Sequence, residues 1–325
     1  MRQSMKIAVI GGAGFIGSSI TKAYLDAGHD VVVLDNLSHG SPDAVDARAR
    51  FYSVDVRDSR VHEIFQQERP RIVSYHAAHY YRGVHEQAMA DADIHIRGLL
   101  NVLEGCIAAQ VDKIIFASNG NSLYGPLKEA KLPATEEMPL HPCRPLDISK
   151  VACEWYIRHY TRTYGLHHTI LRYADVYGET DSSFLQHPLS YFVQELVARR
   201  RPILRAPNHV LRDHIFIDDV VRANLLALLR GDNETLHISA GQGCTNYQLF
   251  RVASILLESQ LEPVYVGSET QSEIGSLVLS NERAHRLLGW TPEVNMVQGV
   301  QRAVSMLHTV LQEQVTLQVA RVAHR

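Results

Sequence analysis

The chain has 325 residues, of which 46% are hydrophobic and 21% charged, so there is enough apolar material for a large globular core. A formal charge of −3 gives no reason to expect nucleic acid as a partner, and no apolar stretch approaches the ~18 residues that a membrane span needs. The four cysteines lie far apart and lack metal-ligand spacing, so we expect no disulfides, no metal site and a cytoplasmic location.

The first predicted strand, Lys6–Ile10, runs into closely spaced glycines that are followed by a helical pattern. Gly12, Gly14 and Gly17 match G-x-G-x-x-G, and Gly11, Gly14 and Gly17 match its variant with two residues between each pair. Such a turn brings bare backbone up to a pyrophosphate, whose charge the helix N-terminus favours. Asp35 follows Gly17 by 18 positions, close to the offset of about 20 for an acid that binds ribose hydroxyls. Because a carboxylate repels a ribose 2′-phosphate, the motif predicts NAD in preference to NADP.

Short β-branched runs alternate with helical patterns over the first half of the chain. The expected strands are 6–10, 31–34, 51–54, 71–75, 113–117 and 169–172, and the expected helices lie near 15–27, 60–68, 91–109 and 147–164. This alternation predicts an α/β fold with a Rossmann-type doubly wound parallel sheet.

Beyond residue 175 the alternation loosens, and the patterns predict helices near 189–200, 218–230, 246–259 and 297–315. We expect a dinucleotide-binding domain over residues 1–175 and a smaller, mainly helical substrate lobe over residues 176–325, with the chain free to cross back between them. The lobe is expected to lie over the carboxyl ends of the strands, where ligands of open α/β sheets bind.

Seven further segments resemble the extended short-chain dehydrogenase/reductase family, and within it the NAD-dependent sugar-nucleotide epimerases and dehydratases. They are Asp35–Gly40, Asp55–Val56, His76–Ala78, Leu123–Gly125, Leu171–Gly178, Arg212–Val220 and Leu288–Pro292. The resemblance runs nearly end to end. It implies transfer of a hydride to bound NAD and its return, on a nucleotide-activated sugar or similar polyol, without net redox change.

The resemblance also implies residues of the cofactor and substrate sites. Those expected to contact NAD are Gly11, Gly14, Phe15, Ile16 and Gly17 at the pyrophosphate, Asp35, Asn36, Ser38 and Gly40 at the adenosine ribose, Asp55 and Val56 at the adenine, Ala77 and Ala78 beneath the cofactor, Lys150 at the nicotinamide ribose, and Tyr173. Tyr124, Asp175 and Arg212 are expected to contact the substrate, with Arg212 on its diphosphate. The family commonly dimerises through two long helices per subunit, which correspond here to 91–109 and 147–164, so we expect a homodimer.

The residue that removes the proton departs from the family pattern. The family places Tyr-x-x-x-Lys on a helix, where the lysine lowers the tyrosine pKa and the phenolate takes a hydroxyl proton. Here Lys150 is present, but Leu146 occupies the tyrosine position. Because a leucine cannot exchange protons, the usual mechanism cannot operate unchanged.

Three further family positions differ in the same region of the expected site. The family's serine or threonine falls on Gly120, or on Asn119 with one residue inserted, and its two asparagines fall on His95 and Asp175. Ser118 and Ser122 lie close enough in sequence to supply the missing hydroxyl. The expected cofactor residues are therefore intact, while the expected reacting residues are replaced.

Three explanations fit this pattern. In the first, another group takes over proton transfer, for which the candidates are Asp147, His79, Tyr80, Tyr81 and His95. In the second, the chain is a dehydrogenase or reductase, or an eliminating enzyme, for a different polyol-like substrate; in the third, it has lost catalysis and only binds NAD and a ligand. Because a bare NAD sensor needs no diphosphate clamp, the retention of Arg212, Asp213 and the whole lobe favours an active enzyme. We expect an epimerase or dehydratase with a non-standard proton acceptor.

Overall fold

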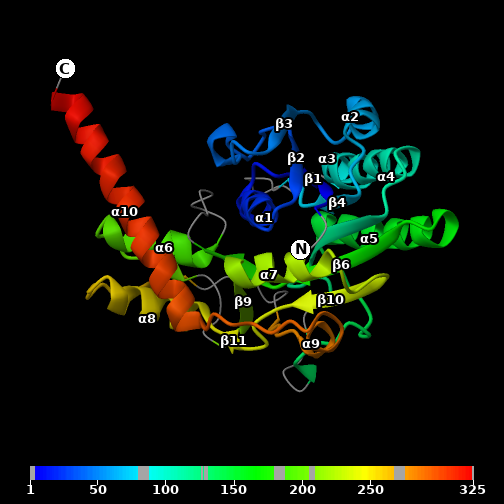
Figure 1. Cartoon of the computed structure of the whole chain (residues 1–325). Coiled ribbons are helices and arrows are strands. Elements are labelled where there is room, and N and C mark those ends of the chain that lie inside the picture. Colours follow the sequence, from blue (N-terminus) through cyan, green and yellow to red (C-terminus); the bar gives the residue numbers. More distant parts are fainter. Residues whose placement is uncertain are drawn as a thin grey trace.

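The centre of the fold is a seven-stranded sheet in which all neighbouring strands run parallel (Figure 1). The computed structural model describes residues 4–79, 88–125, 127, 131–178, 187–204, 209–266 and 275–323, with side chains as far as residue 309. In spatial order the strands are β10 (Glu234–Ile238), β6 (His167–Tyr173), β5 (Lys113–Asn119), β4 (Ile72–Tyr75), β1 (Lys6–Ile10), β2 (Asp30–Asp35) and β3 (Arg50–Ser53). This order confirms the predicted doubly wound sheet.

Side chains of the central strands alternate between two apolar layers. Along β1, Ile7 and Val9 pack into one layer and Ala8 and Ile10 into the other, because successive side chains of a strand point to opposite faces. The helices that cover the first face are α1 (Phe15–Asp26) and α7 (Ile217–Ala227), and those that cover the second are α2 (Arg60–Glu68), α4 (Gly98–Ala108) and α5 (Pro145–Tyr164). Continuous β-branched runs are typical of strands buried on both faces.

The order of the strands reverses between β1 and β4. From β1 the chain passes through α1 to β2 and then β3, whereas from β4 it proceeds in the other direction to β5, β6 and finally β10. Ligands of open α/β sheets bind beside the carboxyl ends of strands at such a reversal, because the crossovers diverge there. The candidate site is built from the loops that leave these strand ends.

The second half of the chain builds two smaller sheets and returns once to the large one. β7 (Asp175–Tyr177), β9 (Arg212–Phe216) and β11 (Gly243–Cys244) form one small sheet, and β8 (Ile203–Leu204) and β12 (Val264–Tyr265) form the other. Three helices, α6 (Pro188–Val197), α8 (Asn246–Leu256) and α10 (Met296–Ala323), pack together, while α9 (Glu282–Leu288) contacts β10. The return through α7 and β10 means that the chain crosses back to the large sheet after residue 176. The end of α10 extends away from the other elements (Figure 1).

The segment predicted as one helix over 91–109 is three consecutive pieces. They are α3 (Ala88–Ala92), a turn of π-helix η2 (Asp93–Arg97) and α4. A Cβ on Gly98 would lie 2.5 Å from Cγ2 of Val56, so α4 starts in close contact with the loop after β3. A sequence pattern with a 3.6-residue period does not reveal the one extra residue that a π-turn inserts into a helix. Such turns frequently occur at functional sites.

A short 3-10 helix, η1 (Pro42–Ala44), was also not predicted. Among the described residues, no helix combines the length and apolarity that a membrane crossing requires.

Candidate active site

The chain between β1 and the first turn of α1 packs against other backbone so closely that Gly11 and Gly17 have no room for a side chain. Gly11 has a φ of +78°, and a Cβ there would lie 2.6 Å from the backbone nitrogen of Ala77. A Cβ on Gly17 would overlap the carbonyl oxygen of Gly11. A Cβ on Gly14 would meet that oxygen at an ordinary 3.6 Å and no other described atom within 4 Å. No side chain caps the first amides of α1, so the loop and the start of this helix form a cradle whose uncapped helical N–H groups fit a phosphate pair.

The carboxylate of Asp35 joins this cradle to the loop that follows β2. It accepts a hydrogen bond from the amide of Ala13 (3.0 Å). Gly40 closes the same loop against the cradle, because a Cβ there would lie 2.6 Å from the carbonyl oxygen of Ala13. Asn36 donates to the carboxylate of Asp55 (2.8 Å). The residues expected at the adenosine ribose and the adenine therefore lie together beside the cradle.

Lys150 is buried on α5, one helical turn after Leu146. Its Nζ donates to the carbonyl oxygen of Ala117 (2.9 Å) and lies 4.8 Å from the ring centre of Phe116. Burial lowers the pKa of Lys150. The ammonium group therefore lies at the carboxyl end of β5, next to the strands that border the cradle.

His95 occupies the π-turn and is only 2% exposed. Its Nε2 lies 3.4 Å from backbone atoms of His79 and 3.5 Å from the carboxylate of Asp91. Burial and the nearby charge of Lys150 lower the pKa of His95 to about 3, so the imidazole is neutral at physiological pH. His95 is therefore a buried, neutral imidazole near Lys150.

Four polar side chains meet where β5 ends and α5 begins. Asp147 is 1% exposed, and its Oδ1 accepts hydrogen bonds from the hydroxyl of Ser122 (2.5 Å) and the amide of Asn119 (2.9 Å). Its Oδ2 accepts from Nε of Arg144 (3.0 Å). The Ser122 oxygen also accepts from Asn119 (2.7 Å) and from Nη2 of Arg144 (3.1 Å). The hydroxyl proton of Ser122 therefore points at the buried carboxylate of Asp147, the residue that follows Leu146 in the sequence.

The sequence around Asp147 explains why this carboxylate faces the site. Pro145 occupies the first turn of α5, where its fixed φ suits a helix start and its missing N–H costs nothing. Asp147 then falls in the first turn, where the helix dipole favours a negative charge. Arg144 is the N-cap residue and reaches its partner at the i,i+3 spacing.

Several other predicted residues have partners in the core or lie outside the described ranges. Hydroxyl bonds to core partners are made by Ser118 to Glu154 (2.7 Å), Tyr124 to Arg172 (2.7 Å) and to His237 (2.5 Å), and Tyr173 to Asn224 (2.9 Å). Of the two nearby serines, only Ser122 reaches Asp147 in the described structure. Tyr80 and Tyr81 lie outside the described residues.

The second cluster of polar groups lies on one face of the small β11-β9-β7 sheet. Asp175 stands opposite His214 in the register of β7 and β9, and Arg212 is two residues earlier on β9, so all three share a face. Nε of Arg212 donates to Asp175 (3.3 Å). The Arg212 side chain is 20% exposed to solvent and the Asp175 side chain 32%. His187, the N-cap residue of α6, approaches His214 with 3.0 Å between ring nitrogens.

Three members of these clusters were not predicted at the site. Arg144 could have been found from its i,i+3 spacing to Asp147 ahead of the helix-starting proline. His214 carries a weaker signal, since the resemblance places a phenylalanine there, and nothing in the sequence marks His187 as its partner. Strand register and the path of the chain bring the two imidazoles together.

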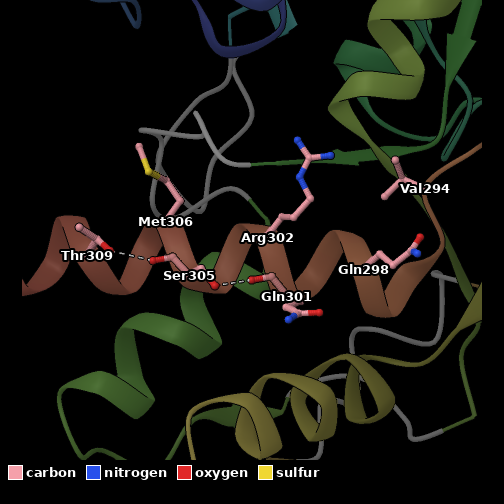
Figure 2. Close-up of a pocket in the computed structure, with 7 residues that line it drawn as sticks. All are labelled: Val294, Gln298, Gln301, Arg302, Ser305, Met306 and Thr309. Carbon is pink, nitrogen blue, oxygen red and sulfur yellow. Dashed lines mark hydrogen bonds between the residues drawn. The ribbon is translucent and has the colours of Figure 1, made fainter.

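An open groove of about 730 Å³ runs along α10, at a distance in sequence from both clusters. Figure 2 shows Arg302 and Met306 projecting from the same side of that helix. Arg302 pairs with Asp218 (2.8 Å) and stacks on the ring of Phe216. The groove shares no residue with the cradle, the Ser122–Asp147 cluster or the Asp175–Arg212 pair. Within the described ranges, no group of three or more His, Cys, Asp or Glu residues could hold a metal ion.

Comparison with known sequences places these features in a family context. The pattern of the NAD dependent epimerase/dehydratase family matches residues 7–241. The putative UDP-glucose 4-epimerase of Methanocaldococcus jannaschii is 33% identical over 303 residues, which cover 93% of this chain and 98% of that protein. The UDP-glucose 4-epimerase of Lacticaseibacillus casei is 32% identical, and the match covers 89% of this chain and 92% of that protein.

Solved structures give the same result. The UDP-glucose 4-epimerase of Thermotoga maritima, crystallised with UDP-glucose, has a TM-score of 0.90 at 34% identity and covers 94% of this chain and 100% of its own. The UDP-glucose 4-epimerase of Thermus thermophilus in complex with NAD has a TM-score of 0.87 at 31% identity, with coverages of 93% and 99%. The likeness therefore extends over both the large sheet and the second half of the chain.

Proposed function

Because the chain belongs to the NAD dependent epimerase/dehydratase family, we propose that it is a UDP-sugar 4-epimerase, which inverts the configuration at C4 of the sugar. As a member of this family, it is an enzyme and its cofactor is NAD. The choice of a UDP-sugar is supported by relatives above 30% identity, which carry the name UDP-glucose 4-epimerase and match over about nine-tenths of the chain or more.

The residues that border the cradle fit NAD. Gly11, Gly14 and Gly17 keep side chains out of the way of the pyrophosphate at the uncapped start of α1, and the Asp35 carboxylate lies beside them for the adenosine ribose. Lys150 would hold the nicotinamide ribose. When bound, NAD would supply the redox chemistry as acceptor and donor of the hydride at C4 of the sugar.

The proton of the C4 hydroxyl passes to Asp147 through Ser122. Asp147 is buried, whereas Ser122 is partly exposed, so a sugar hydroxyl can reach the serine but not the carboxylate. As the C4 hydroxyl is oxidised, its O–H bond breaks and the proton moves to Ser122 Oγ, while the Ser122 proton moves to Oδ1 of Asp147. Both protons move back when the hydroxyl is formed again. Asn119 and Arg144 hold the two groups in this geometry, and the sugar hydroxyl replaces the bond from the half-exposed Arg144 to Ser122.

Arg212 binds the substrate diphosphate from the second half of the chain. It is the charged side chain on the shared face of β9, it is partly exposed, and a guanidinium fits two phosphate oxygens at once.

The remaining part of the proposal is a homodimer. Trp155 and Ile148 are exposed on α5, and because they are seven residues apart they lie on the same face of that helix.

The single observation that carries the proposal is the Ser122–Asp147 pair beside a buried Lys150, at the position where Leu146 leaves the family's phenol missing. The test is to load the purified chain with NAD, add UDP-glucose and separate the products by chromatography. We expect UDP-galactose to appear without net NADH. Formation of a dehydrated sugar would establish a dehydratase instead, and bound NAD and UDP-glucose without any product would establish a binding protein.

A further inference from the structure

The histidines next to Arg212 form a hydrogen-bond chain with a fixed direction. The amide of Leu189 donates to Nδ1 of His187 (3.2 Å), so the proton of a neutral His187 sits on Nε2. That Nε2 faces Nδ1 of His214 at 3.0 Å and donates to it, which leaves the proton of His214 on Nε2. Nε2 of His214 is buried and has no hydrogen-bond partner among the described residues. The chain therefore ends in a buried N–H donor.

Charge around this donor is balanced in the free protein. Arg212 carries one positive charge and Asp175 one negative charge, and they are paired with each other. Burial lowers the pKa of His187 to about 3 and lowers that of His214, so both imidazoles are neutral near pH 7. Burial raises the pKa of Asp175, whereas the charge of the adjacent Arg212 guanidinium lowers it, and the net shift is downward. A diphosphate with two negative charges would enter a neutral cluster in which Arg212 is already engaged.

The other groups that face Asp175 do not supply a compensating charge. Asn121 faces it from the loop after β5 and is uncharged. Asp213 points to the opposite face of β9, where it accepts the amides of Ala240 and Leu279, and burial raises its pKa to about 7. Burial also raises the pKa of Cys244 on β11 to about 12, so the thiol is neutral, and Tyr177 stacks on His187 as a neutral ring. The two histidines are therefore the groups of this cluster that can gain a positive charge.

We propose that the His187–His214 pair takes up one proton when a nucleotide diphosphate binds, which frees Arg212 from Asp175 for the phosphates. The positive charge on the histidine pair then balances the negative charge of the Asp175 carboxylate, a role that Arg212 has in the free protein. His187 and His214 are positioning residues in this scheme, since they act through Arg212. The inference rests on the proposed binding of the diphosphate at Arg212.

The test is calorimetric titration of the NAD-loaded full chain with UDP-glucose in two buffers of different ionisation enthalpy. The phosphates of UDP-glucose are diesters and do not titrate near neutral pH, so any proton exchanged with the buffer comes from the protein. The heat of any turnover is the same in both buffers and cancels. Because the complex holds more protons than the free protein, its affinity must fall as pH rises. Uptake of one proton over this whole range would weaken binding by about a hundredfold from pH 6.5 to pH 8.5.

Two variants and one control test whether the proton is taken up by the His187–His214 pair. Asp175→Asn frees Arg212 permanently, so we expect tight binding without proton uptake at either pH. His214→Phe removes the acceptor, so we expect weaker binding without uptake. His168→Gln is the control, since His168 is another buried histidine but bonds to Thr161 away from this sheet, and we expect uptake as in the wild type.

Three outcomes would overturn the inference: no binding of UDP-glucose at either pH, binding with less than about 0.2 proton taken up, or normal uptake in both Asp175→Asn and His214→Phe. Turnover is assayed separately by chromatography. Turnover without proton uptake would reject this inference and leave the epimerase proposal standing. Proton-coupled binding without turnover would do the reverse.

Discussion

The hydroxyl oxygen of Ser122 lies 2.5 Å from a carboxylate oxygen of Asp147, and that carboxylate is closed off from solvent. A serine paired in this way can pass a proton that the carboxylate could not reach by itself. The pair lies next to Leu146, where the family resemblance leads one to expect a phenol. The proton route that we propose therefore runs through the start of α5 and the end of β5.

Removing the Ser122 hydroxyl should reduce turnover far more than stability. We expect Ser122→Ala to lower kcat of the UDP-glucose reaction by about 10²- to 10⁴-fold, the usual contribution of a positioned acid or base. Asp147→Asn should lower kcat similarly, because the amide cannot take the proton. Ser118→Ala is the matched control, since its hydroxyl bonds to Glu154 in the core. If Ser122→Ala keeps kcat within about threefold of the wild type, the relay is wrong.

Restoring the phenol should bypass this relay. Leu146 is half-buried and one helical turn before Lys150, so Leu146→Tyr would place a phenol beside the ammonium group. We expect kcat to rise, and we expect the double variant Leu146→Tyr/Ser122→Ala to retain activity that Ser122→Ala alone loses. Initial rates of the three variants, each checked for bound NAD, decide the matter. A folded, NAD-bound Leu146→Tyr that is no faster than the wild type would mean that the sugar does not lie beside this turn of α5.

Two glycine substitutions should separate cofactor binding from folding. The Cβ of Gly14→Ala meets only ordinary contacts in the protein but points into the space left for the pyrophosphate, so we expect NAD to bind at least about tenfold more weakly with little change in Tm. Gly17→Ala would force α1 away from the carbonyl of Gly11 and should lower both Tm and NAD affinity. Fluorescence titration with NADH and thermal melts measure the two effects. Equal NAD affinity in Gly14→Ala and the wild type would contradict this account of the cradle.

Glu154 and Arg172 form an ion pair that is closed off from solvent. The Glu154 carboxylate is 0% exposed and accepts two bonds from Arg172 (2.9 and 2.6 Å). Glu154→Gln leaves the guanidinium buried without a counter-charge, so we expect the free energy of unfolding to fall by about 3 to 5 kcal/mol. Glu63→Gln, at an exposed position on α2, should change it by less than about 0.5 kcal/mol. Urea unfolding of both variants measures the difference, and equal stabilities would show that Arg172 finds another partner.

The exposed face of α5 should be an interface between two copies of the chain. Trp155 is 58% exposed and Ile148 51% exposed, and because they share one face of α5 they form an apolar patch that a second copy of the chain would cover. We expect the wild type to sediment as a dimer and Trp155→Lys to sediment as a monomer. Ile255→Lys changes a similarly exposed residue on α8 and should remain dimeric. A wild-type monomer at micromolar concentration would refute the assignment of this face.

The fold could be predicted from the sequence because its signals are local. Alternating β-branched runs and helical spacings located the six predicted strands of the large sheet to within two residues at each end, since each depends on the residues of one segment. The glycine motif and Asp35 likewise act through their own loops. By contrast, the π-turn at His95 ends beside Gly98, which packs closely against Val56, and no periodicity records such a contact between segments.

The order of residues along the chain was enough to predict the doubly wound sheet, which the structure confirms, and to predict a cradle for a dinucleotide and a leucine, Leu146, at the position of the family's phenol. Which polar groups meet in its place became clear only from the folded chain. Ser118 and Ser122 are equivalent in sequence, but the direction of the chain after β5 sends one to Glu154 and the other to Asp147. His187 and His214 are paired only because α6 starts against β9. Hydrogen bonds require approach within about 3 Å, and for residues far apart in sequence that approach depends on how the whole chain packs.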